Sequence, residues 1–599
     1  MRKRSAKPEE SEVIGTDSET NQGPPITMQF YSETARQING CVFIKRQSAV
    51  LTFLRQLKKL KPGRYRMYGH NLEFDMLSFL WEVREKIRDG NIDLHIGEWD
   101  IQGRYAKPIF AVFSDGKRRI ELVDSFLWFM TSLERVAERV CPDLPKLQRP
   151  PGLGITDYSP TDMVFVDYAM RDAVVAYHAG HAIERYHRQL EVPSQISLAS
   201  MGAAVFRTKY MQNDIYQPPL YEWMVGAAAS YHGGVNRILP DADMCWHQNV
   251  TALDISSAYP DAWQCLPDFS NPNGYKSFKS VKRNSSIRKV PDVGVYKISG
   301  TTTKCNWPAL FHHDFSPISG NFSNVWVTGW ELNEALRADE VRVTKVNGYH
   351  YVTDSDYSPF REYANFFYNS KNTEQDIVLS YMHKITLNAP TGKLIQTSPD
   401  FTLVDGKLVK IKRAGGLYHP FAASLTTGHT RAKIHQLEHK YGALHTATDG
   451  VFVPGRYEGA REKKLGAVVS EGHGDLALFR NKLYIFYTDA IKGKTFESQV
   501  FKGRHILKCA RHGYQGTIAD LERMTISPSR EYKINKPVKL KTSLKGGSKH
   551  VANEFVTSVR KLNIGGVFQV KKYGEKGRVL MGGSASRAKH ASKKARKCT

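Results

Sequence analysis

Two aspartates far apart in the chain have the surroundings that metal-assisted phosphoryl transfer requires. Asp254 follows a run of small and apolar residues that predicts a strand, and a Ser-Ala-Tyr-Pro turn is expected after it. Asp449 precedes Gly450 between alternating apolar residues, the pattern of a β-hairpin with an Asp-Gly turn. Oxygen ligands favour Mg²⁺, and two such ions can clamp the attacking and leaving oxygens of an in-line phosphoryl transfer. Taken alone, each aspartate more often marks an ordinary turn, so the surrounding segments decide.

Three further acids in the first third of the chain stand where a cation can be held. Asp17 and Glu19 are two positions apart in a predicted strand, so their side chains point to the same face. Residues 65–81 predict a strand, a glycine-containing turn and an amphipathic helix. Asn71 is expected to cap that helix, and Asp75 lies in its first turn, where the helix dipole favours an acid. A surface strand and a capped helix would explain these residues without catalysis.

A fourth acid has an unusual place on a longer predicted helix. The helix is expected to begin at Asp162, and Tyr168 and Asp172 lie one turn apart on the same face. Asp172 is followed by Ala-Val-Val, an apolar setting in which a carboxylate needs a partner. A purely structural role explains this segment less well than the other two.

In this order, the three segments resemble the exonuclease motifs of proofreading DNA polymerases. The resemblance implies that four acids bind two metal ions: Asp17, Glu19, Asp75 and Asp172. It implies contacts with single-stranded DNA for Asn71, Phe74 and Ser125. Tyr168 would help to orient the attacking water. Lys146 matches a supporting lysine of the protein-primed branch of these enzymes, but Arg149 stands where that branch has an apolar residue.

The segment that contains Asp254 resembles motif A of the family B DNA polymerases. It reads Asp-Ile-Ser-Ser-Ala-Tyr-Pro, with alanine where the family has leucine. The resemblance implies that Asp254 binds both metal ions and that Ser257 and Tyr259 contact the incoming nucleotide. The Tyr259 ring would exclude a 2′-hydroxyl and so select deoxynucleotides by steric rejection. A preceding Tyr-His-Gly-Gly turn resembles the YxGG motif of protein-primed enzymes, which implies DNA contacts for Tyr231, Gly233 and Gly234.

Positive charge for a triphosphate is expected on a helix predicted over residues 373–387. Its period puts Tyr381, Lys384 and Asn388 on one face. The proline and glycine of the Asn-Ala-Pro-Thr-Gly stretch that follows are expected to end the helix. A lysine on this face can neutralise phosphate oxygens as a point charge.

The same stretch resembles motif B of the family, KxxxNSxYG, with two departures. Ala389 replaces the serine, and Thr391 replaces the tyrosine that packs near the nascent base pair. The resemblance implies that Lys384 and Asn388 bind the nucleotide. Lys371 is a second candidate for the phosphates, and otherwise a solvated lysine.

The predicted hairpin resembles motif C, which reads YxDTDS in the family. The first aspartate is Ala447 in this chain, whereas the second, Asp449, is present. In the family pattern Asp254 and the second aspartate carry the metals, so polymerisation is expected, with an altered metal preference. Downstream, an Asn-Lys-Leu-Tyr sequence resembles the KxY motif, which implies that Lys482 and Tyr484 contact primer-template and nucleotide.

Length and charge fit a large protein with a polyanionic partner. The chain has 599 residues, 41% of them hydrophobic, and a net charge of +26. No window of about 20 residues is apolar enough for a membrane span, and the basic N-terminus lacks the apolar stretch of a signal peptide. Scattered cysteines favour a reducing compartment, here the cytoplasm, and argue against a structural zinc site: Cys41, Cys141, Cys245, Cys265, Cys305, Cys509 and Cys598.

The resemblance covers residues 13–570 and implies an α/β and α+β multidomain fold. An RNase H-like exonuclease domain would precede a right-hand polymerase domain with palm, fingers and thumb. The second Asp-Gly hairpin, predicted at 401–411, would belong to the later of two insertions typical of protein-primed enzymes. The expected segments are exonuclease 1–190, palm 191–267, first insertion 268–358, fingers 359–393, second insertion 394–418, palm 419–525, a lysine-rich thumb 526–575 and a basic tail 576–599.

The implied activity is template-directed DNA synthesis with 3′–5′ proofreading. Two Mg²⁺ ions would serve each active site, with Mn²⁺ as a substitute, in a monomer that replicates a viral or plasmid genome. The implied partners are primer-template, single-stranded DNA, deoxynucleotides and a terminal protein primer. Three alternatives remain: synthesis without a terminal protein, a nuclease whose polymerase half is degenerate, and a non-catalytic DNA-binding or packaging protein.

Overall fold

The structure, a computed structural model, describes most of the chain. The described residues are 10–20, 25–45, 47–87, 91–105, 108–148, 150, 158–214, 221–240, 242–281, 287–303, 308–404, 407–460, 464–488, 500–501, 504–511, 519–520, 531–537, 555–561 and 569–581. Arg149, most of the lysine-rich segment after residue 537 and the tail after residue 581 therefore lie outside them.

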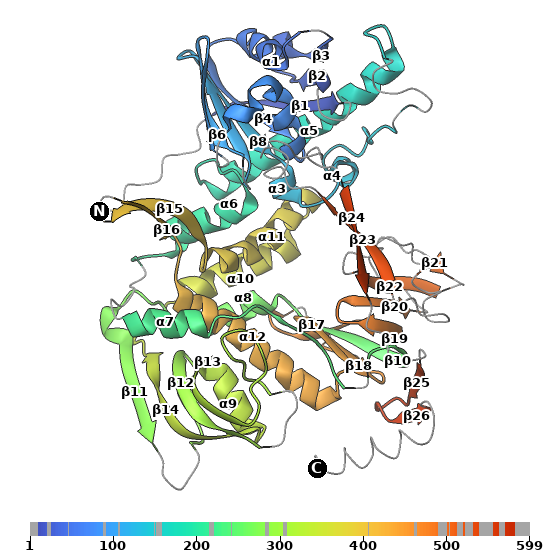
Figure 1. Cartoon of the computed structure of the whole chain (residues 1–599). Coiled ribbons are helices and arrows are strands. Elements are labelled where there is room, and N and C mark those ends of the chain that lie inside the picture. The colour runs from blue at the N-terminus through green and yellow to red at the C-terminus, as the bar shows by residue number, and fades with distance from the viewer. Residues whose placement is uncertain are drawn as a thin grey trace. The chain divides into compact units, whose positions relative to one another are not determined.

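The chain forms two compact units (Figure 1). Unit 1 comprises Met1–Lys209, Phe367–Pro390 and Lys536–Val556, and unit 2 comprises Tyr210–Phe366, Thr391–Asn535 and Thr557–Thr599. Part of the expected fingers segment thus belongs to the same unit as the expected exonuclease. The finer division into eight segments stays a prediction.

Unit 1 is built on an eight-stranded sheet with the order β3-β2-β1-β4-β8-β7-β6-β5. The three central strands, β1, β4 and β8, run parallel, and the outer pairs are antiparallel. The strands are β1 (Glu12–Thr20), β2 (Pro25–Tyr31), β3 (Gly40–Phe43), β4 (Gly63–Gly69), β5 (Asn91–Ile96), β6 (Trp99–Arg104), β7 (Phe110–Ser114) and β8 (Arg118–Asp124). The strand predicted for Asp17 and Glu19 is confirmed as β1.

Helices of unit 1 cover this sheet, and the long helix α5 packs across β1, β2 and β4 (Figure 1). They are α1 (Ala49–Lys58), α2 (Glu73–Phe79), α3 (Phe126–Phe129), α4 (Leu133–Val140), α5 (Met163–Leu190) and α6 (Leu198–Val205). Asp162 begins α5 as predicted, because its side chain accepts a hydrogen bond from the backbone N–H of Phe165. The predicted capping of α2 by Asn71 is wrong: Leu72 precedes the helix, and no side chain caps it.

Helix α10 (Pro359–Thr373) is followed by helix α11 (Ile377–Lys393), and α11 covers most of the range 373–387 over which a helix was predicted. Asp376 caps α11 by accepting hydrogen bonds from the N–H groups of Val378 and Leu379 at 2.8 and 3.1 Å. The predicted stop was wrong, because α11 continues through Pro390. Pro390 has no N–H to donate to the preceding turn, so α11 continues past it with one backbone hydrogen bond fewer.

Unit 2 contains a ten-stranded sheet that continues from β21 through β22, β20, β19, β10, β18 and β17 to β9, with β25 and β26 beside β10. The strands are β9 (Val235–Ile238), β10 (Cys245–Ile255), β17 (His445–Thr448), β18 (Gly450–Pro454), β19 (Val468–Arg480), β20 (Leu483–Thr488), β21 (Val500–Phe501), β22 (Arg504–Arg511), β25 (Gln569–Tyr573) and β26 (Val579–Met581). Helices α7 (Tyr221–Ala229), α8 (Ala258–Trp263) and α9 (Gly329–Arg337) contact the long helix α12 (Pro420–Tyr441).

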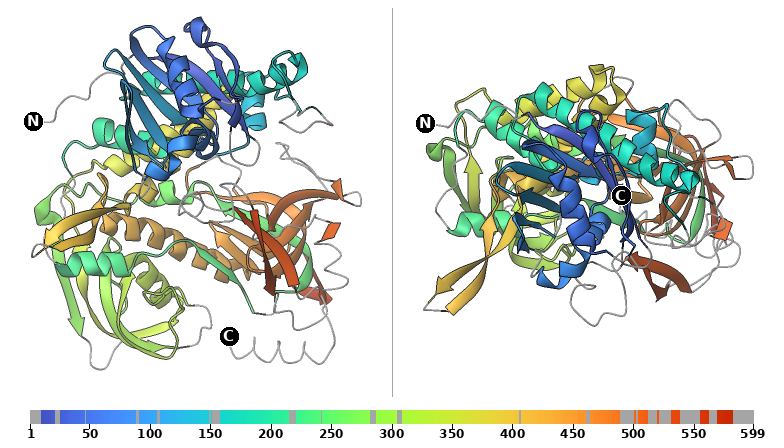
Figure 2. Two further views of the ribbon diagram at one scale, coloured as in Figure 1. Left: turned by 45° about the horizontal axis from the view of Figure 1, so that its top comes forward. Right: turned by 90° about the horizontal axis from the view of Figure 1, so that it is seen from above.

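A second sheet of unit 2, with its own apolar core, lies within the region expected as the first insertion. Its order is β11-β14-β12-β13, from β11 (Tyr275–Val281), β12 (Gly294–Thr302), β13 (Asn321–Thr328) and β14 (Val341–Tyr351). Helix α12 lies between this sheet and the ten-stranded one (Figure 2). The second predicted hairpin is confirmed as the antiparallel pair β15 (Thr397–Val404) and β16 (Lys407–Ala414), while β23 (Glu531–Pro537) and β24 (Phe555–Lys561) form a separate pair.

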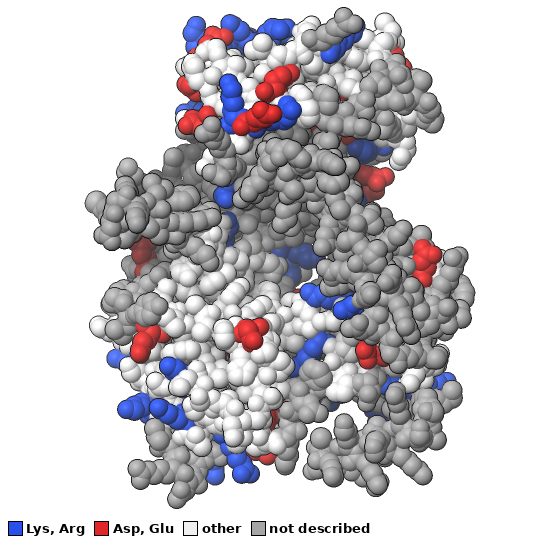
Figure 3. Space-filling view, in the orientation of Figure 1, with Lys and Arg blue, Asp and Glu red and all other residues white. Residues whose placement is uncertain are grey.

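Basic side chains are frequent on the surface of the described residues. On the face drawn in Figure 3, lysine and arginine side chains lie in several groups, with acidic side chains interspersed. Within the described residues, none of the helices combines the length and the apolar character that a membrane crossing requires.

Candidate active sites

The first candidate site lies where helix α5 meets strand β1 of unit 1. Asp17 and Glu19 share one face of β1, and Asp172 projects from α5. Gly15 makes this contact so close that an added Cβ would lie 1.9 Å from the carbonyl oxygen of Ala173 and 2.5 Å from the N of Tyr177. Because Gly15 has no side chain, α5 can lie close enough to β1 to place Asp172 near the acids of the strand.

The acids of this site repel one another. Asp75, on α2, is 2% exposed and accepts a hydrogen bond from the hydroxyl of Ser18 at 2.7 Å. Burial, and next the nearby Asp75, Asp172 and Glu19 charges, raise the pKa of Asp17 well above its usual range. Burial also raises the pKa of Asp75 to about 8. The four predicted ligands thus converge electrostatically, and a divalent cation would relieve this crowding.

Lys146 supplies positive charge at the same place. Its ammonium group forms an ion pair with Asp172, which is 6% exposed. Its charge also lowers the pKa of Asp17 against the effect of burial. Tyr168 lies one turn before Asp172 on α5 and is half-buried, with its ring 6.3 Å from that of Phe165. The structure thus brings Lys146 to the acids, as the resemblance implies.

The residues predicted to contact single-stranded DNA lie in two segments, one that follows β4 and one that follows β8. Asn71 is exposed and has a left-handed backbone with φ 63°, while Phe74 is half-buried on α2. Ser125 is fully buried and lies 2.9 Å from Nδ1 of His70. Direct contact of the Ser125 hydroxyl with DNA would therefore require this pairing to open.

Asp124 was not predicted, yet it fixes this loop. Its carboxylate accepts hydrogen bonds from the N–H groups of Asn71 and Phe126, each at 2.9 Å. It also contributes to the raised pKa of Asp75. The neighbouring Ser125 was noted from the sequence, but nothing local marked Asp124, because its partner lies 53 residues away.

The second candidate site lies between strands β10 and β18 of unit 2. Asp254 pairs with Gly450 in the antiparallel register, and the N–H of Ile255 donates to the carbonyl of Asp449 at 2.9 Å. Asp254, near the end of β10, and Asp449, in the turn before β18, thus lie close together and line one pocket of about 290 Å³. A Cβ on Gly450 would lie 3.0 Å from Oδ1 of Asp254, so glycine leaves room for that carboxylate.

The hairpin is confirmed, but its turn differs from the predicted one. Ala447 pairs with Gly450, so Thr448 and Asp449 form the two-residue loop and Gly450 begins β18. Thr448 takes the left-handed conformation, φ 61°, which is unusual for a β-branched residue. Ala447 lines the pocket and presents a methyl group where the family has a carboxylate.

Three residues beyond the predicted ones shape the surroundings of Asp449. Burial raises the pKa of its carboxyl, the Lys508 charge lowers it, and Glu471 raises it further. Lys508 and Glu471 form an ion pair on neighbouring parts of the sheet. Lys508 and Cys509 line the pocket, on strand β22. No sequence signal marked them, because pairing of β22 with β20 brings them here.

The Tyr-His-Gly-Gly loop packs against the hairpin turn. A Cβ on Gly234 would lie 2.5 Å from Cγ2 of Thr448, so the second glycine permits this approach. Arg431 of α12 donates to the carbonyls of His232 and Gly233 at 2.5 and 3.1 Å. Tyr231 is half-buried, whereas a Cβ on Gly233 would meet nothing within 4 Å. The loop is thus tied to the turn that carries Asp449.

Tyr259 lies in a helix rather than in the predicted turn. Ser257 has φ 54°, and α8 begins at Ala258, so the proline falls within the first turn of the helix, where a missing N–H costs little. Tyr259 is half-buried. Burial raises the pKa of its hydroxyl, and the Asp449 charge raises it further, which indicates that ring and carboxylate are near each other.

The predicted nucleotide lysines belong to unit 1, whereas Asp254 and Asp449 belong to unit 2. Lys371 on α10 and Lys384 on α11 face each other closely enough to repel: burial, and next the Lys384 charge, lower the pKa of Lys371 to about 8. Lys384 is exposed, and Asn388 is tied to it through a hydrogen bond to its carbonyl at 3.0 Å. A bound polyanion would relieve the repulsion between these two positive charges.

The two residues of the Lys-Leu-Tyr sequence occupy different environments. Lys482 is exposed at the tip of the β19–β20 hairpin, with φ 59°. Tyr484 on β20 is 8% exposed and lines the same pocket as Asp254 and Asp449. Burial raises the pKa of its hydroxyl to about 12. The structure therefore brings Tyr484, rather than Lys482, to the pocket wall.

Carboxylate oxygens dominate both sets of candidate metal ligands. Asp17, Glu19, Asp75 and Asp172 offer only oxygen donors in unit 1, and Asp254 and Asp449 do so in unit 2. This chemistry fits Mg²⁺ or Mn²⁺ and disfavours softer metals.

Comparison with known proteins identifies the fold through structure alone. No protein-family model and no curated protein matches the sequence. Phi29 DNA polymerase complexed with primer-template DNA and incoming nucleotide substrates matches with a TM-score of 0.63 and 14% identity, over 92% of this chain and 100% of that chain. The same coverage holds for its complex with single-stranded DNA, at a TM-score of 0.62 and 15% identity, and for its orthorhombic crystal form, at 0.60 and 14%. The chain therefore has the fold of phi29 DNA polymerase, a protein-primed family B polymerase.

Proposed function

We propose that the chain is a template-directed DNA polymerase with a 3′–5′ exonuclease. One observation carries the proposal. In a fold shared with phi29 DNA polymerase over 92% of the chain, Asp254 on β10 and Asp449 in the turn before β18 line one pocket. Solved structures of that enzyme are complexes with primer-template DNA, with incoming nucleotides and with single-stranded DNA, and we propose the same partners here.

Asp254 and Asp449 would hold the metal ions of the polymerase. Two bound Mg²⁺ ions activate an attacking hydroxyl and offset charge on a leaving pyrophosphate. The protein's own contribution is to fix Asp254 on β10 and to hold the turn of Asp449 against it by the hydrogen bond from the N–H of Ile255, which leaves little reorganisation for the reaction. Lys371, Lys384 and Asn388 would bind the triphosphate, and Tyr259 with Ser257 would bound the sugar. Tyr231, Gly233, Gly234, Lys482 and Tyr484 would contact primer-template.

The exonuclease would use the acids at the α5–β1 contact. Asp17, Glu19, Asp75 and Asp172 would hold two metal ions, whose charge relieves their mutual repulsion. Lys146 orients Asp172 through its ion pair, and Tyr168 on the same helix face would position the attacking water. Asn71, Phe74 and Ser125 would guide the single strand.

The proposal extends to priming by a terminal protein, in a monomer with strand displacement. Two features support it: the region 268–358 forms a sheet with its own core, and residues 397–414 form a two-stranded ribbon. These are the two regions in which the sequence resemblance predicts the insertions of protein-primed enzymes. Incubation with labelled deoxynucleotide and the candidate primer protein tests this part, since a covalent nucleotide–protein adduct is expected. Synthesis from a DNA primer without any adduct would refute protein priming alone.

Extension of a primed single-stranded circle with Mg²⁺ tests the main proposal. The Asp17→Ala/Asp172→Ala protein serves as background, so that degradation does not mask synthesis. Asp449→Asn should abolish extension. Asp475→Asn is the matched control on β19 of the same sheet, because its Oδ1 accepts a hydrogen bond from the N–H of Asn249 at 3.1 Å, which asparagine can still accept. Equal extension by Asp449→Asn and wild type would refute the assignment.

A nuclease with a degenerate polymerase half is the second candidate, because Ala447 lines the pocket where the family has a carboxylate. It predicts degradation of single-stranded DNA by the wild type and no extension by the exonuclease-deficient protein. A non-catalytic DNA-binding protein predicts neither. Comparing both activities in one preparation separates the three.

A further inference from the structure

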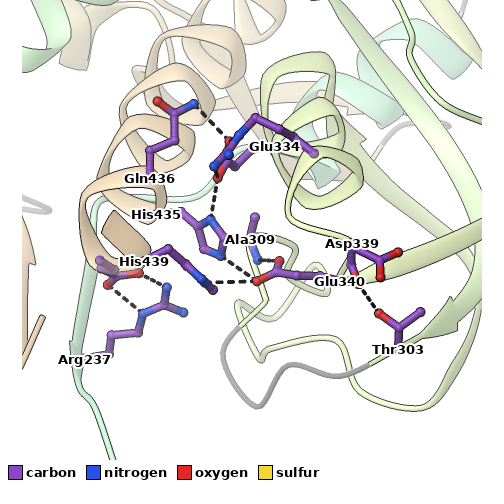
Figure 4. Close-up of polar contacts among 11 residues, drawn as sticks. Arg237, Thr303, Ala309, Glu334, Asp339, Glu340, His435, Gln436 and His439 are labelled. Carbon is purple, nitrogen blue, oxygen red and sulfur yellow. Dashed lines mark hydrogen bonds and ion pairs between the residues drawn. The ribbon is translucent and has the colours of Figure 1, made fainter. Parts of the chain in front are cut away.

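Three side chains of metal-binding type converge in unit 2, and none belongs to the acids assigned above. Within the described residues, this is the one group of three histidine, cysteine, aspartate or glutamate side chains whose ligand atoms lie within 4.8 Å of one another. Glu340 directly precedes β14, and His435 and His439 lie one turn apart on α12. Figure 4 shows both imidazole rings directed from the helix toward the Glu340 carboxylate.

The distances nearly match those of a metal site. Nε2 of His435 lies 2.9 Å, and Nε2 of His439 lies 3.2 Å, from the same oxygen, Oε1 of Glu340. A tetrahedral zinc ion with bonds of about 2.0–2.2 Å keeps its ligand atoms about 3.4 Å apart. Side-chain shifts of a few tenths of an ångström therefore bring each nitrogen–oxygen pair to the required separation. Two histidines four residues apart on a helix are also a recurrent zinc-binding arrangement.

A second layer of contacts holds the ligands in place. Nδ1 of His435 lies 2.9 Å from Oε1 of Glu334, so this carboxylate can fix the tautomer that leaves Nε2 free for a metal. The other oxygen of Glu340 accepts a hydrogen bond from the N–H of Ala309 at 3.0 Å. Glu334 is itself bound by Arg337 at 2.7 and 2.8 Å and by Gln436 at 3.0 Å.

The cluster is buried on one side and open on the other. The side chains of Glu340 and His435 are each 2% exposed, whereas that of His439 is 44% exposed. An ion could thus enter past His439, and water could fill the fourth position. Nitrogen and oxygen donors together favour zinc over Mg²⁺.

We propose that Glu340, His435 and His439 bind one Zn²⁺ ion, which ties the start of β14 to helix α12. A dication with two neutral imidazoles would offset the charge of Glu340, while Arg337 offsets that of Glu334. The ion would thus cross-link two chain segments some distance apart in sequence within unit 2. The scattered cysteines gave no sign of this site, because its donors are histidine and glutamate.

The alternative is an ion-pair cluster without metal. Burial lowers the pKa of His435, but hydrogen bonds to Glu334 and Glu340 outweigh it and raise that pKa to about 9. The imidazolium would then donate from both nitrogens. The two interpretations differ in one observable, which is stoichiometric zinc binding that depends on His439.

Zinc binding by the full-length chain tests the proposal. The protein is stripped with a chelator and returned to millimolar Mg²⁺, which fills sites made of carboxylates alone. It is then titrated with Zn²⁺ against a chromophoric chelator. One zinc per chain is expected. The half-exposed His439 can be replaced without disturbing the core, and His439→Ala, which removes a ligand, should weaken binding by more than the roughly 10- to 100-fold that loss of an outer-shell partner costs.

His95→Ala is the matched control, because His95 also pairs with a carboxylate, Asp100 at 2.8 Å, but belongs to no group of three metal-binding side chains in the part of the chain that the structure describes. It should keep the wild-type affinity, and Glu334→Gln should weaken binding by about 10- to 100-fold. Substituted Co²⁺ should give the intense visible bands of a tetrahedral site in the wild type and lose them in His439→Ala. A wild type without a tight zinc site, or one unaffected by His439→Ala, would overturn the proposal.

Discussion

Replacement of Gly15 by alanine should disable the exonuclease while it spares polymerisation. The new Cβ would lie 1.9 Å from the carbonyl oxygen of Ala173; its position is fixed by the backbone of residue 15, and the oxygen belongs to the backbone of α5, so neither can rotate away. Real Cβ contacts essentially never fall below 3.0 Å, so α5 must recede from β1 by about 1.1 Å or more. Asp172 immediately precedes Ala173 and must move with it, away from Asp17.

A displacement of about 1 Å lowers the rate of an enzyme reaction by a known order of magnitude. Misplacing a reacting group by about 1 Å can lower a rate by about 100-fold. Overpacking of this kind typically costs about 1–3 kcal/mol of stability, which a protein of this size can tolerate while it remains folded. We therefore expect Gly15→Ala to degrade single-stranded DNA about 100-fold more slowly than the wild type.

The assay compares nuclease and extension rates in the same preparation. Gly97→Asn is the matched control: Gly97 lies in the turn between β5 and β6 of the same sheet, with φ 62° and no atom within 4 Å of an added Cβ. Asparagine tolerates this conformation, so the control should keep both activities. An exonuclease rate for Gly15→Ala within a factor of about three of the wild type would refute the packing argument, and parallel loss of extension would indicate misfolding instead.

Three further predictions follow from the geometry and the charges. Gly450→Ala, whose Cβ would lie 3.0 Å from Oδ1 of Asp254, should slow primer extension by about 10- to 100-fold and leave the exonuclease intact. In EDTA, the raised pKa of Asp75 stabilises the fold below about pH 4, and this contribution is lost as the pH rises toward about 8. The Tm advantage of Asp75→Asn over the wild type should therefore grow from pH 5 to 8. Because the pKa of Lys371 is lowered to about 8, deoxynucleotide affinity should fall as the pH rises through 8, and Lys384→Ala, by removing the repelling charge, should shift that fall to higher pH.

Each of these three predictions would be contradicted by a specific result. Exonuclease loss in Gly450→Ala would place the defect in folding rather than in the Asp254 pocket. A Tm difference for Asp75→Asn that is constant between pH 5 and 8 would contradict the raised pKa. Deoxynucleotide binding whose pH dependence is identical in wild type and Lys384→Ala would show that the two lysines do not interact.

Local elements of both sites were predictable because short-range chemistry determines them. Alternating side chains put Asp17 and Glu19 on one face of β1, and Asp162 caps α5 as its position suggests. The hairpin around Asp449 follows from its alternating apolar residues. These features depend on neighbours within a few residues, which the sequence displays directly.

Other features depend on partners that no local pattern reveals. Nothing near Lys508 indicates that β22 brings it to the pocket of Asp449. Asn71 does not cap α2, because its loop is held instead by Asp124, from the end of β8. Helix α11 continues past Pro390 although the proline removes one of its backbone hydrogen bonds. Tertiary contacts decide the first two cases against the local expectation, and the third shows that a proline does not always end a helix.

Both candidate sites contain a glycine at a close approach: a Cβ would overlap backbone at Gly15 and would crowd the carboxylate of Asp254 at Gly450. Gly15 draws α5 against β1, and Gly450 opens space beside Asp254. The acids are therefore positioned by main-chain packing, which deforms little, rather than by flexible side chains. It follows that adding one methyl group at either glycine should imitate removal of an acid, in one activity at a time. Because Gly15 belongs to unit 1 and Gly450 to unit 2, the two substitutions should separate degradation from synthesis as cleanly as replacement of the carboxylates themselves.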